Sequence, residues 1–276
     1  MPKFFFRSMA ALMVIFLAWS LALPAHADME KIRQSGTLKV AVYDDLVPFS
    51  AGGRGIDIEL AEALAKKLGL KLALLPFPAG ENLGDDLRNM VWKGHYLGYG
   101  PADVLLHVPV DRHLIAENPK VEIFAPYYRD AVQLVRRVAT VPSYDGLASL
   151  AGKKIGVEKI SISAVVLLGE DGGKYREQVR IYPTAAEALA QLQAGALDAV
   201  LANRSEIESA VGRDPNYQVH DVSFPRLPRQ GWVVGMAVKK DQAELARLLQ
   251  AASDELTASG ELAKIFSKHG VAAIRP

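Results

Sequence analysis

The sequence predicts an α/β protein built from two lobes, and three observations carry this prediction. First, β-rich segments alternate with segments whose apolar residues recur at helical spacing, as in sheets covered by helices. Second, one block of helix, glycine and buried strand occurs twice, with Gly94 before residues 103–106 and Gly195 before residues 198–201. Third, the 276-residue chain is 50% hydrophobic, which suffices for two cores of ordinary size.

The first 27 residues have the features of a secretory signal peptide. Lys3 and Arg7 precede an apolar run at residues 9–23, and the small residues Ala25 and Ala27 follow in an A-x-A arrangement. An uncleaved membrane anchor is the alternative, but this run is shorter than the roughly 20 residues that span a bilayer. We therefore expect cleavage after Ala27, export to the periplasm and no stable membrane insertion.

The first lobe is predicted from two helical patterns set between three strand patterns. Strands are expected at residues 37–43, 70–76 and 103–108, and helices at 56–68 and 83–91. Gly69 ends the first helix as a cap. The near-continuous apolar run at 103–108 is typical of a buried parallel strand.

The same alternation starts again in the second half of the chain. Strands are expected at residues 131–138, 153–157, 178–182, 199–202 and 232–238, and helices at 163–168, 185–194, 242–256 and 260–269. We therefore expect mostly parallel sheets with helices on both faces. Ligands of such sheets bind beyond the carboxyl ends of the strands, so the cleft between the lobes is the expected site.

The composition excludes several classes of function. Lys plus Arg total 32 and Asp plus Glu total 31, a balance that argues against a nucleic-acid partner. The chain has no cysteine, so disulfides, thiolate catalysis and Cys-ligated metals are excluded. His95, His107 and His113 would have to converge to hold a metal, and no hydrolase motif is present. We expect no metal site, no cofactor and no catalytic residues.

Several short motifs follow one another in an order that is typical of one family. They occupy residues 36–42 (GTLKVAV), 55–65 (GIDIELAEALA), 125–128 (APYY), 152–157 (GKKIGV), 195–200 (GALDAV) and 260–266 (GELAKIF). Together they resemble the extracellular solute-binding proteins of polar-amino-acid-type ABC transporters, over nearly the whole mature chain. The resemblance implies a periplasmic binding protein-like fold of type II, with two Rossmann-like lobes joined by a two-strand hinge.

The resemblance also implies the lobe boundaries of the chain, its oligomeric state, its ligand and its partner. Residues 28–129 would form the first part of lobe I, residues 130–228 lobe II, and residues 229–276 the completion of lobe I. The chain would cross between the lobes near 128–132 and again near 225–233. A monomer that closes on a small-molecule ligand and delivers it to an ABC permease is implied.

Arg112 and His107 are the ligand-binding residues predicted in lobe I. Arg112 falls where the family has a Thr-x-x-Arg pattern, and a guanidinium matches a carboxylate with two charged hydrogen bonds. The alternative for Arg112 is a solvated surface residue or a partner of Asp111. His107 stands where the family usually has a small residue, and it is either a ligand contact or a structural histidine.

Asn203 marks the departure from the family that says most about the ligand. The resemblance places an Asp here, which holds the ligand's ammonium group. An amide carries no charge to compensate a buried ammonium, which would cost several kcal/mol. We therefore expect a ligand that is not an ordinary α-amino acid.

The remaining predicted contacts are two serines and three aromatic residues. Ser161 and Ser163 are donors at a predicted helix N-terminus, where plain capping of the helix is the alternative. Tyr43, Phe49 and Trp232 offer flat faces to a planar ligand, with core or hinge packing as the alternative for Phe49 and Trp232. These residues together with Arg112 fit a small, planar, carboxylated compound.

Two other functions stay open beside uptake of such a ligand. The departures also resemble the branch of the family associated with quinoprotein alcohol dehydrogenases. That branch would make the chain a carrier of pyrroloquinoline quinone (PQQ) or a partner of a periplasmic quinoprotein dehydrogenase. Some relatives of this fold are periplasmic enzymes such as cyclohexadienyl dehydratases, and Glu158 or His107 would then be the candidate base. We expect a binding protein rather than an enzyme.

Overall fold

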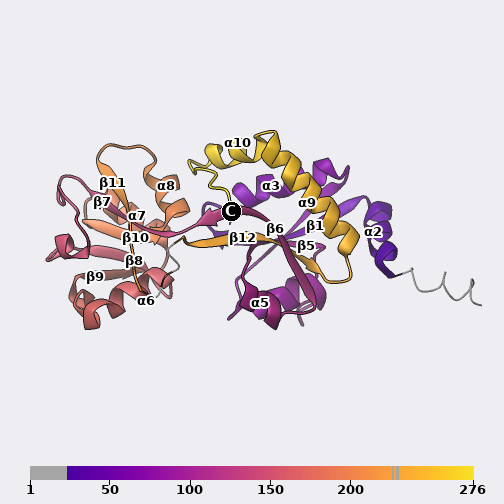
Figure 1. Ribbon diagram of the computed structural model, residues 1–276, viewed down its shortest axis with the longest axis horizontal. Coiled ribbons are helices and arrows are strands. Elements are labelled where there is room, and N and C mark those ends of the chain that lie inside the picture. The colour runs from indigo at the N-terminus through magenta and orange to yellow at the C-terminus, as the bar shows by residue number, and fades with distance from the viewer. Residues whose placement is uncertain (1–23, 226, 228–229) are drawn as a thin grey trace, which may run out of the picture.

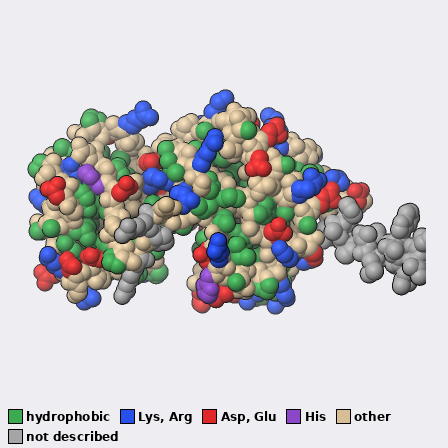
Figure 2. Space-filling view, viewed as in Figure 1, with side chains coloured by type: hydrophobic (Ala, Val, Ile, Leu, Met, Phe, Trp, Pro, Cys, Tyr) green, Lys and Arg blue, Asp and Glu red, His purple; other side chains and the backbone are tan. Residues whose placement is uncertain are grey.

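The protein consists of two lobes, each formed by a five-stranded sheet with helices packed on it (Figure 1). The computed structural model describes residues 24–225, 227 and 230–276. Figure 2 shows the lobes as two rounded masses joined by a narrower waist, with charged side chains of both signs interspersed on the visible face. Most of the expected signal peptide lies outside the described residues, so its cleavage stays a prediction.

Lobe I contains the first and the last part of the chain. Its strands are β1 (Thr37–Tyr43), β4 (Lys71–Phe77), β5 (Val104–Pro109), β6 (Val121–Asp130) and β12 (Trp232–Lys239), with a small hairpin of β2 (Asp45–Leu46) and β3 (Ser50–Ala51). Its helices are α2 (Pro24–Ser35), α3 (Ile56–Lys67), α4 (Leu83–Leu87), α5 (Arg112–Glu117), α9 (Ala243–Ala258) and α10 (Glu261–Lys268), and a π-helical turn at Arg88–Trp92 continues α4.

Lobe II contains the middle of the chain. Its strands are β7 (Val132–Arg137), β8 (Ile155–Glu158), β9 (Val179–Tyr182), β10 (Ala199–Asn203) and β11 (Tyr217–Asp221). Its α-helices are α6 (Ile162–Gly169), α7 (Ala185–Gln193) and α8 (Arg204–Val211). Short 3-10 turns at Leu147–Leu150, Glu170–Gly173 and Arg176–Gln178 complete the lobe.

The two sheets share one topology. Lobe I has the strand order β4-β1-β5-β12-β6, and lobe II has the order β9-β8-β10-β7-β11. The first three strands of each order are parallel, but the other two pairings in each sheet are antiparallel. The expectation of mostly parallel sheets is therefore only half right, while the α/β class with two lobes is confirmed. The antiparallel strands are those through which the chain passes between the lobes.

Each sheet is buried on both faces, which explains its apolar strands. In β1, Leu38, Val40 and Val42 face the core formed with α3, α9 and α10, whereas Ala41 faces a second core with Leu87. This alternation follows from the two-residue period of a strand. The same arrangement gives lobe II two cores, one on each side of its sheet.

The hinge consists of closely packed strand ends and the C-terminal tail. The chain passes from β6 into β7 at Ala131 and returns into β12, whose Trp232 pairs with Asp130. The hydroxyl of Ser205 on α8 donates to Asp130 Oδ2 at 2.5 Å. The tail runs between the lobes (Figure 1), where Ala272 N–H donates to Glu208 Oε2 of lobe II at 2.8 Å. Polar contacts therefore tie the lobes together beside the strands.

Across residues 24–225, 227 and 230–276, every helix is too short or too polar to cross a membrane.

Candidate ligand-binding site

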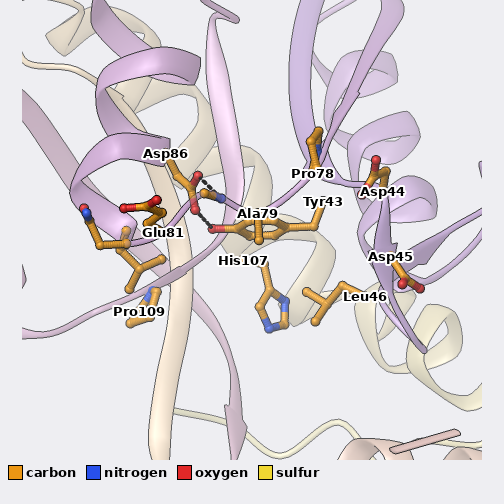
Figure 3. Close-up of a pocket in the computed structure, with 13 residues that line it drawn as sticks. Tyr43, Asp44, Asp45, Leu46, Pro78, Ala79, Glu81, Asp86, His107 and Pro109 are labelled. Atoms are coloured by element: carbon orange, nitrogen blue, oxygen red, sulfur yellow. Dashed lines mark hydrogen bonds between the residues drawn. The ribbon is translucent and has the colours of Figure 1, made fainter. Parts of the chain in front are cut away.

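Each lobe has one pocket at the point where the order of its parallel strands reverses direction across the sheet. This point lies between β1 and β5 in lobe I and between β8 and β10 in lobe II. Such reversal points form the crevice in which open α/β sheets bind ligands. The lobe I pocket measures about 670 Å³ and is lined by Tyr43, Asp44, Asp45, Leu46, Pro78, Ala79, Gly80, Glu81, Asn82, Leu83, Asp86, His107 and Pro109 (Figure 3). The lobe II pocket measures about 210 Å³ and is lined by Glu158, Ser161, Ile162, Ser163, Ala185, Leu201, Ala202, Asn203, Glu206 and Trp232.

Tyr43 and Asp86 form a hydrogen-bonded pair on one side of the lobe I pocket. Tyr43 ends β1, its ring packs on Phe77, and its hydroxyl donates to Asp86 Oδ2 at 3.1 Å. Gly80 N–H donates to Asp86 Oδ1 at 2.8 Å. In Figure 3 the ring of Tyr43 reaches toward Asp86, with His107 below it. Burial raises the pKa values of both Tyr43 and Asp86.

His107 is held near the end of β5 by the buried carboxyl group of Asp57. Its backbone has a positive φ of 61°, which is uncommon for a residue with a side chain. Its Nδ1 lies 3.1 Å from Asp57 Oδ2, and the Tyr127 hydroxyl donates to Asp57 Oδ1 at 2.7 Å. His107 N–H donates in turn to the Tyr127 hydroxyl oxygen at 3.0 Å. Because a carboxylate only accepts hydrogen bonds, Nδ1 carries the hydrogen and Nε2 is left for a ligand.

Phe49 lies under His107 in the core of lobe I, rather than over the pocket. It is 2% exposed, and its ring centroid is 4.1 Å from that of His107. Its ring also packs against Tyr128 and Phe266. The core-packing alternative is therefore what the structure shows, and Phe49 acts on the pocket only through His107.

Ser161 and Ser163 both line the lobe II pocket but differ in their partners. Ser161 caps α6: its hydroxyl oxygen accepts from Ala164 N–H at 3.1 Å and donates to Glu158 O at 2.7 Å. Ser163 is 2% exposed, and its hydroxyl makes no hydrogen bond with any described residue. Ser161 thus has the structural role considered as its alternative, and Ser163 is the free donor and acceptor.

This difference predicts opposite consequences for two matched substitutions. Ser161→Ala should lower the free energy of unfolding by about 1 kcal/mol, because a helix cap is lost. Ser163→Ala removes no hydrogen bond within the protein, so stability should hardly change. Ligand affinity should instead fall by about 3–10-fold, the worth of one hydrogen bond. Urea unfolding and ligand titration of both variants check this, and equal stability losses would contradict it.

Glu206 is a site residue that the sequence analysis missed. It stands one helical turn after Asn203 and lines the same pocket. Asn203 N–H donates to Glu206 Oε2 at 2.9 Å, as in a capping box. The signal was available in the sequence as Asn203-x-x-Glu206. The pocket around Asn203 therefore contains a carboxyl group, so Asn203 alone does not argue against a ligand ammonium group.

Trp232 lies at the hinge and Arg112 lies outside both pockets. Trp232 begins β12, lines the lobe II pocket and packs against the cores of both lobes. Arg112 begins α5, just after the N-cap Asp111, and it is exposed. Tyr43, His107, Ser161, Ser163, Asn203 and Trp232 thus line the two pockets, whereas Arg112 and Phe49 do not.

The two pockets are lined by acidic side chains. Asp44, Asp45, Glu81 and Asp86 line the lobe I pocket, and Glu158 and Glu206 line the lobe II pocket. Among the described residues that line these pockets there is no lysine or arginine. Burial, together with the charge of Asp45 from lobe I, raises the pKa of Glu158. The facing surfaces thus have a negative field, which attracts cations.

The fold and these facing pockets define a two-lobed, hinge-linked binding protein. No protein-family model matches the sequence. The chain is 24% identical to a probable histidine-binding protein of Neisseria gonorrhoeae over 84% of its length and 82% of that protein. It is 22% identical to an L-cystine-binding protein of Escherichia coli K12 over 95% of its length and 94% of that protein.

Solved structures agree with this class. The chain superposes on an ancestral cationic amino acid solute-binding protein with a TM-score of 0.68 and 21% identity, over 88% of this chain and 99% of that one. An amino acid ABC transporter substrate-binding protein from Streptococcus pneumoniae, bound to L-arginine, matches with a TM-score of 0.59 and 26% identity, over 90% and 100%. The resemblance is confirmed: the chain is a homologue of solute-binding proteins of polar-amino-acid ABC transporters.

Parts of the chain are also similar to enzymes. A cyclohexadienyl dehydratase of Pseudomonas aeruginosa is 38% identical over 82 residues, which is 28% of this chain and 31% of that protein. The match spans less than a third of the enzyme, whereas the binding proteins align over most of both chains. The expectation that the chain is not an enzyme is thus confirmed by its full-length relatives.

Proposed function

We propose that the protein is the periplasmic solute-binding component of an ABC-type uptake system and that it captures a small cationic solute between its lobes. The observation that carries this proposal is the acidic lining of both pockets, with four carboxyl side chains on one lobe and two on the other. A cationic amino acid is the ligand class with the most support. Structural relatives in which L-arginine is bound have the same fold.

The electrostatics of the cleft favour a cation over an anion. Buried charges are costly unless an opposite charge accompanies them, and closure of the lobes would remove water from those of the six carboxyl groups that are ionised. A ligand with an ammonium or guanidinium group compensates these charges. A net-anionic ligand adds to them, and the α-carboxylate of a cationic amino acid would need closure to bring in a cation such as Arg112.

The planar carboxylated ligand expected from the sequence has weaker support in this cleft. Its case depended on Arg112 as a clamp and on a pocket at Asn203 without a carboxyl group. Arg112 is exposed outside the pockets, and Glu206 shares the pocket with Asn203. PQQ, which carries three carboxylates, would be repelled by the same acidic lining. PQQ and a quinoprotein dehydrogenase partner therefore remain as outcomes of the test.

A thermal-shift panel on the mature chain tests the proposal. It contains L-arginine, L-lysine, L-histidine and a diamine, with L-glutamate, an aromatic carboxylate and PQQ for comparison. A ligand at 100 times its Kd adds about 2.7 kcal/mol, which raises Tm by roughly 5–10 °C for a chain of this size. We expect this shift with cationic compounds alone. A shift with the carboxylates alone would overturn the proposal, and no shift at all would favour a pure partner role.

A matched pair of charge reversals refines the test. Glu158→Lys places a cation at the lobe II pocket and should abolish the shift with cationic compounds. Glu187→Lys makes the same change on the exposed side of α7 in the same lobe, away from the pockets, and should retain the shift. Equal loss in both variants would mean that the general charge of lobe II, rather than the pocket, attracts the ligand.

A further inference from the structure

Glu206 has one oxygen engaged within the protein and one available to the pocket. Its Oε2 accepts the Asn203 N–H in the capping box at the start of α8. Its Oε1 has no hydrogen-bond partner among the described residues. The side chain is half-buried at the lobe II pocket, together with Glu158. A carboxyl group in this position can either remain protonated or form an ion pair with a cationic ligand.

A second, independent feature of the pocket is a serine hydroxyl that a polar ligand can reach. Ser163 is 2% exposed and lines the same pocket, yet its hydroxyl has no hydrogen-bond partner among the described residues. Its hydroxyl oxygen is accessible from the pocket rather than sealed in the core. A polar group of a bound ligand would provide the missing partner for Ser163 next to Glu206.

The groups that face Glu206 are negative or neutral. Glu158 on β8 and Asp130 at the end of β6 both disfavour its charged form, and the Asn203 N–H favours that form. The nearest cation along the chain, Arg204, has its guanidinium 5.6 Å over the ring of Tyr128. Burial is the largest effect, and with the neighbouring carboxyl groups it raises the pKa of Glu206 to about 8.

We propose that Glu206 carries a proton in the empty cleft and releases it to solvent when an ammonium or guanidinium group binds between it and Glu158. The inference rests on the proposed function, because it needs a cationic ligand. The O–H bond of the Glu206 carboxyl group breaks and the proton passes to a buffer base, while the ligand keeps its charge and no bond of the ligand changes. Protons and the cationic ligand therefore compete for one carboxyl group.

Proton competition predicts the pH dependence of binding. At pH 7 the free carboxyl group is mostly protonated, so binding should release about 0.9 proton per ligand. The apparent Kd should rise roughly tenfold for each pH unit below 8, and it should be nearly constant above pH 8. Between pH 9 and pH 6 the loss is about 100-fold. An acidifying periplasm would thus release the ligand.

Isothermal titration calorimetry with L-arginine tests the competition directly. Titrations at pH 6, 7, 8 and 9, each in two buffers of different ionisation enthalpy, give both the Kd and the number of protons released. Glu206→Gln keeps the volume of the side chain and the capping acceptor, so it should fold, bind weakly and release no proton. Glu158→Gln should reduce the pH dependence by removing a repelling charge. Glu187→Gln, on the exposed face of lobe II, is the matched control and should behave as the original chain.

A ligand-free measurement separates this inference from the proposed function. Carbon-13 NMR of the glutamate carboxyl carbons should show one signal that titrates near pH 8 and is missing in Glu206→Gln. A midpoint below pH 6 for that signal, or undiminished proton release in Glu206→Gln, would overturn the inference. Binding of L-arginine without proton release would overturn it and leave the proposed function intact. If no cationic compound of the panel binds, both are wrong.

Discussion

Replacing Asp57 with alanine is expected to lower the free energy of unfolding by about 3–5 kcal/mol. Asp57 is 1% exposed at the start of α3 and accepts from both the Tyr127 hydroxyl and His107 Nδ1. Its loss leaves one buried donor, the Tyr127 hydroxyl, and one partly buried donor, His107 Nδ1, without a partner, and each such group costs about 1–3 kcal/mol. The ring of His107 also loses its orientation, so the lobe I pocket should lose affinity as well.

Urea unfolding of matched variants checks this expectation. Glu62→Ala removes an exposed carboxyl group from the same helix and should change stability by less than about 0.5 kcal/mol. Tyr127→Phe removes the hydroxyl that donates to Asp57 and accepts from His107 N–H, and it should cost about 1–3 kcal/mol. If Asp57→Ala were no worse than Glu62→Ala, the buried network would not be what holds His107 in place.

Gly231→Ala is expected to destabilise the protein by more than about 3 kcal/mol through the hinge. Gly231 has a φ of 68°, and a Cβ atom there would lie 1.8 Å from Asp130 O and 2.8 Å from Ala131 Cβ. The strand that returns to lobe I can approach the outgoing strand this closely only without a side chain. Alanine would force the two hinge strands apart, so ligand affinity should fall together with stability.

Gly69→Ala separates the steric effect from backbone strain. Gly69 has a nearly identical φ of 69°, but no atom lies within 4 Å of the position of its Cβ. That variant should cost only the strain of a left-handed backbone, about 1 kcal/mol. Thermal unfolding and ligand titration of both variants measure the difference. Equal losses would show that the close contact at the hinge is of no consequence.

The local spacing of apolar residues was sufficient to predict those elements in which the strand period of 2 or the helix period of 3.6 residues dominates. The strand predicted at 37–43 is β1, residue for residue, and the helix predicted at 56–68 differs from α3 only at its last residue. The pattern failed for β6, which contains Pro126 among mixed polar and apolar residues. Proline normally argues against a strand, but β6 is at the edge of its sheet, where a missing N–H is tolerated.

The sequence predicted pocket-lining residues at or near strand ends and at the start of α6, but not Asp86 or Glu206. Tyr43 and Asn203 end strands and His107 lies two residues before the end of β5, and parallel strands deliver their carboxyl ends to one edge of a sheet. Asp86 and Glu206 come from α4 and α8, where a carboxyl group has the pattern of an ordinary solvated residue. Their role depends on what the helices pack against, which no local spacing encodes.

The sequence by itself determined the α/β class and the two lobes, and it predicted the edge of each sheet at which the two pockets lie. These features follow from periodicities of 2 and 3.6 residues and from the repeated order of strand and helix, which are local properties of the chain. Only the tertiary structure decided the charge of the cleft, the exposure of Arg112 and the burial of Phe49. Charge and burial depend on residues far apart in the chain, such as Asp45, Asp86, Glu158 and Glu206, and on which of them the packed lobes bring to one surface.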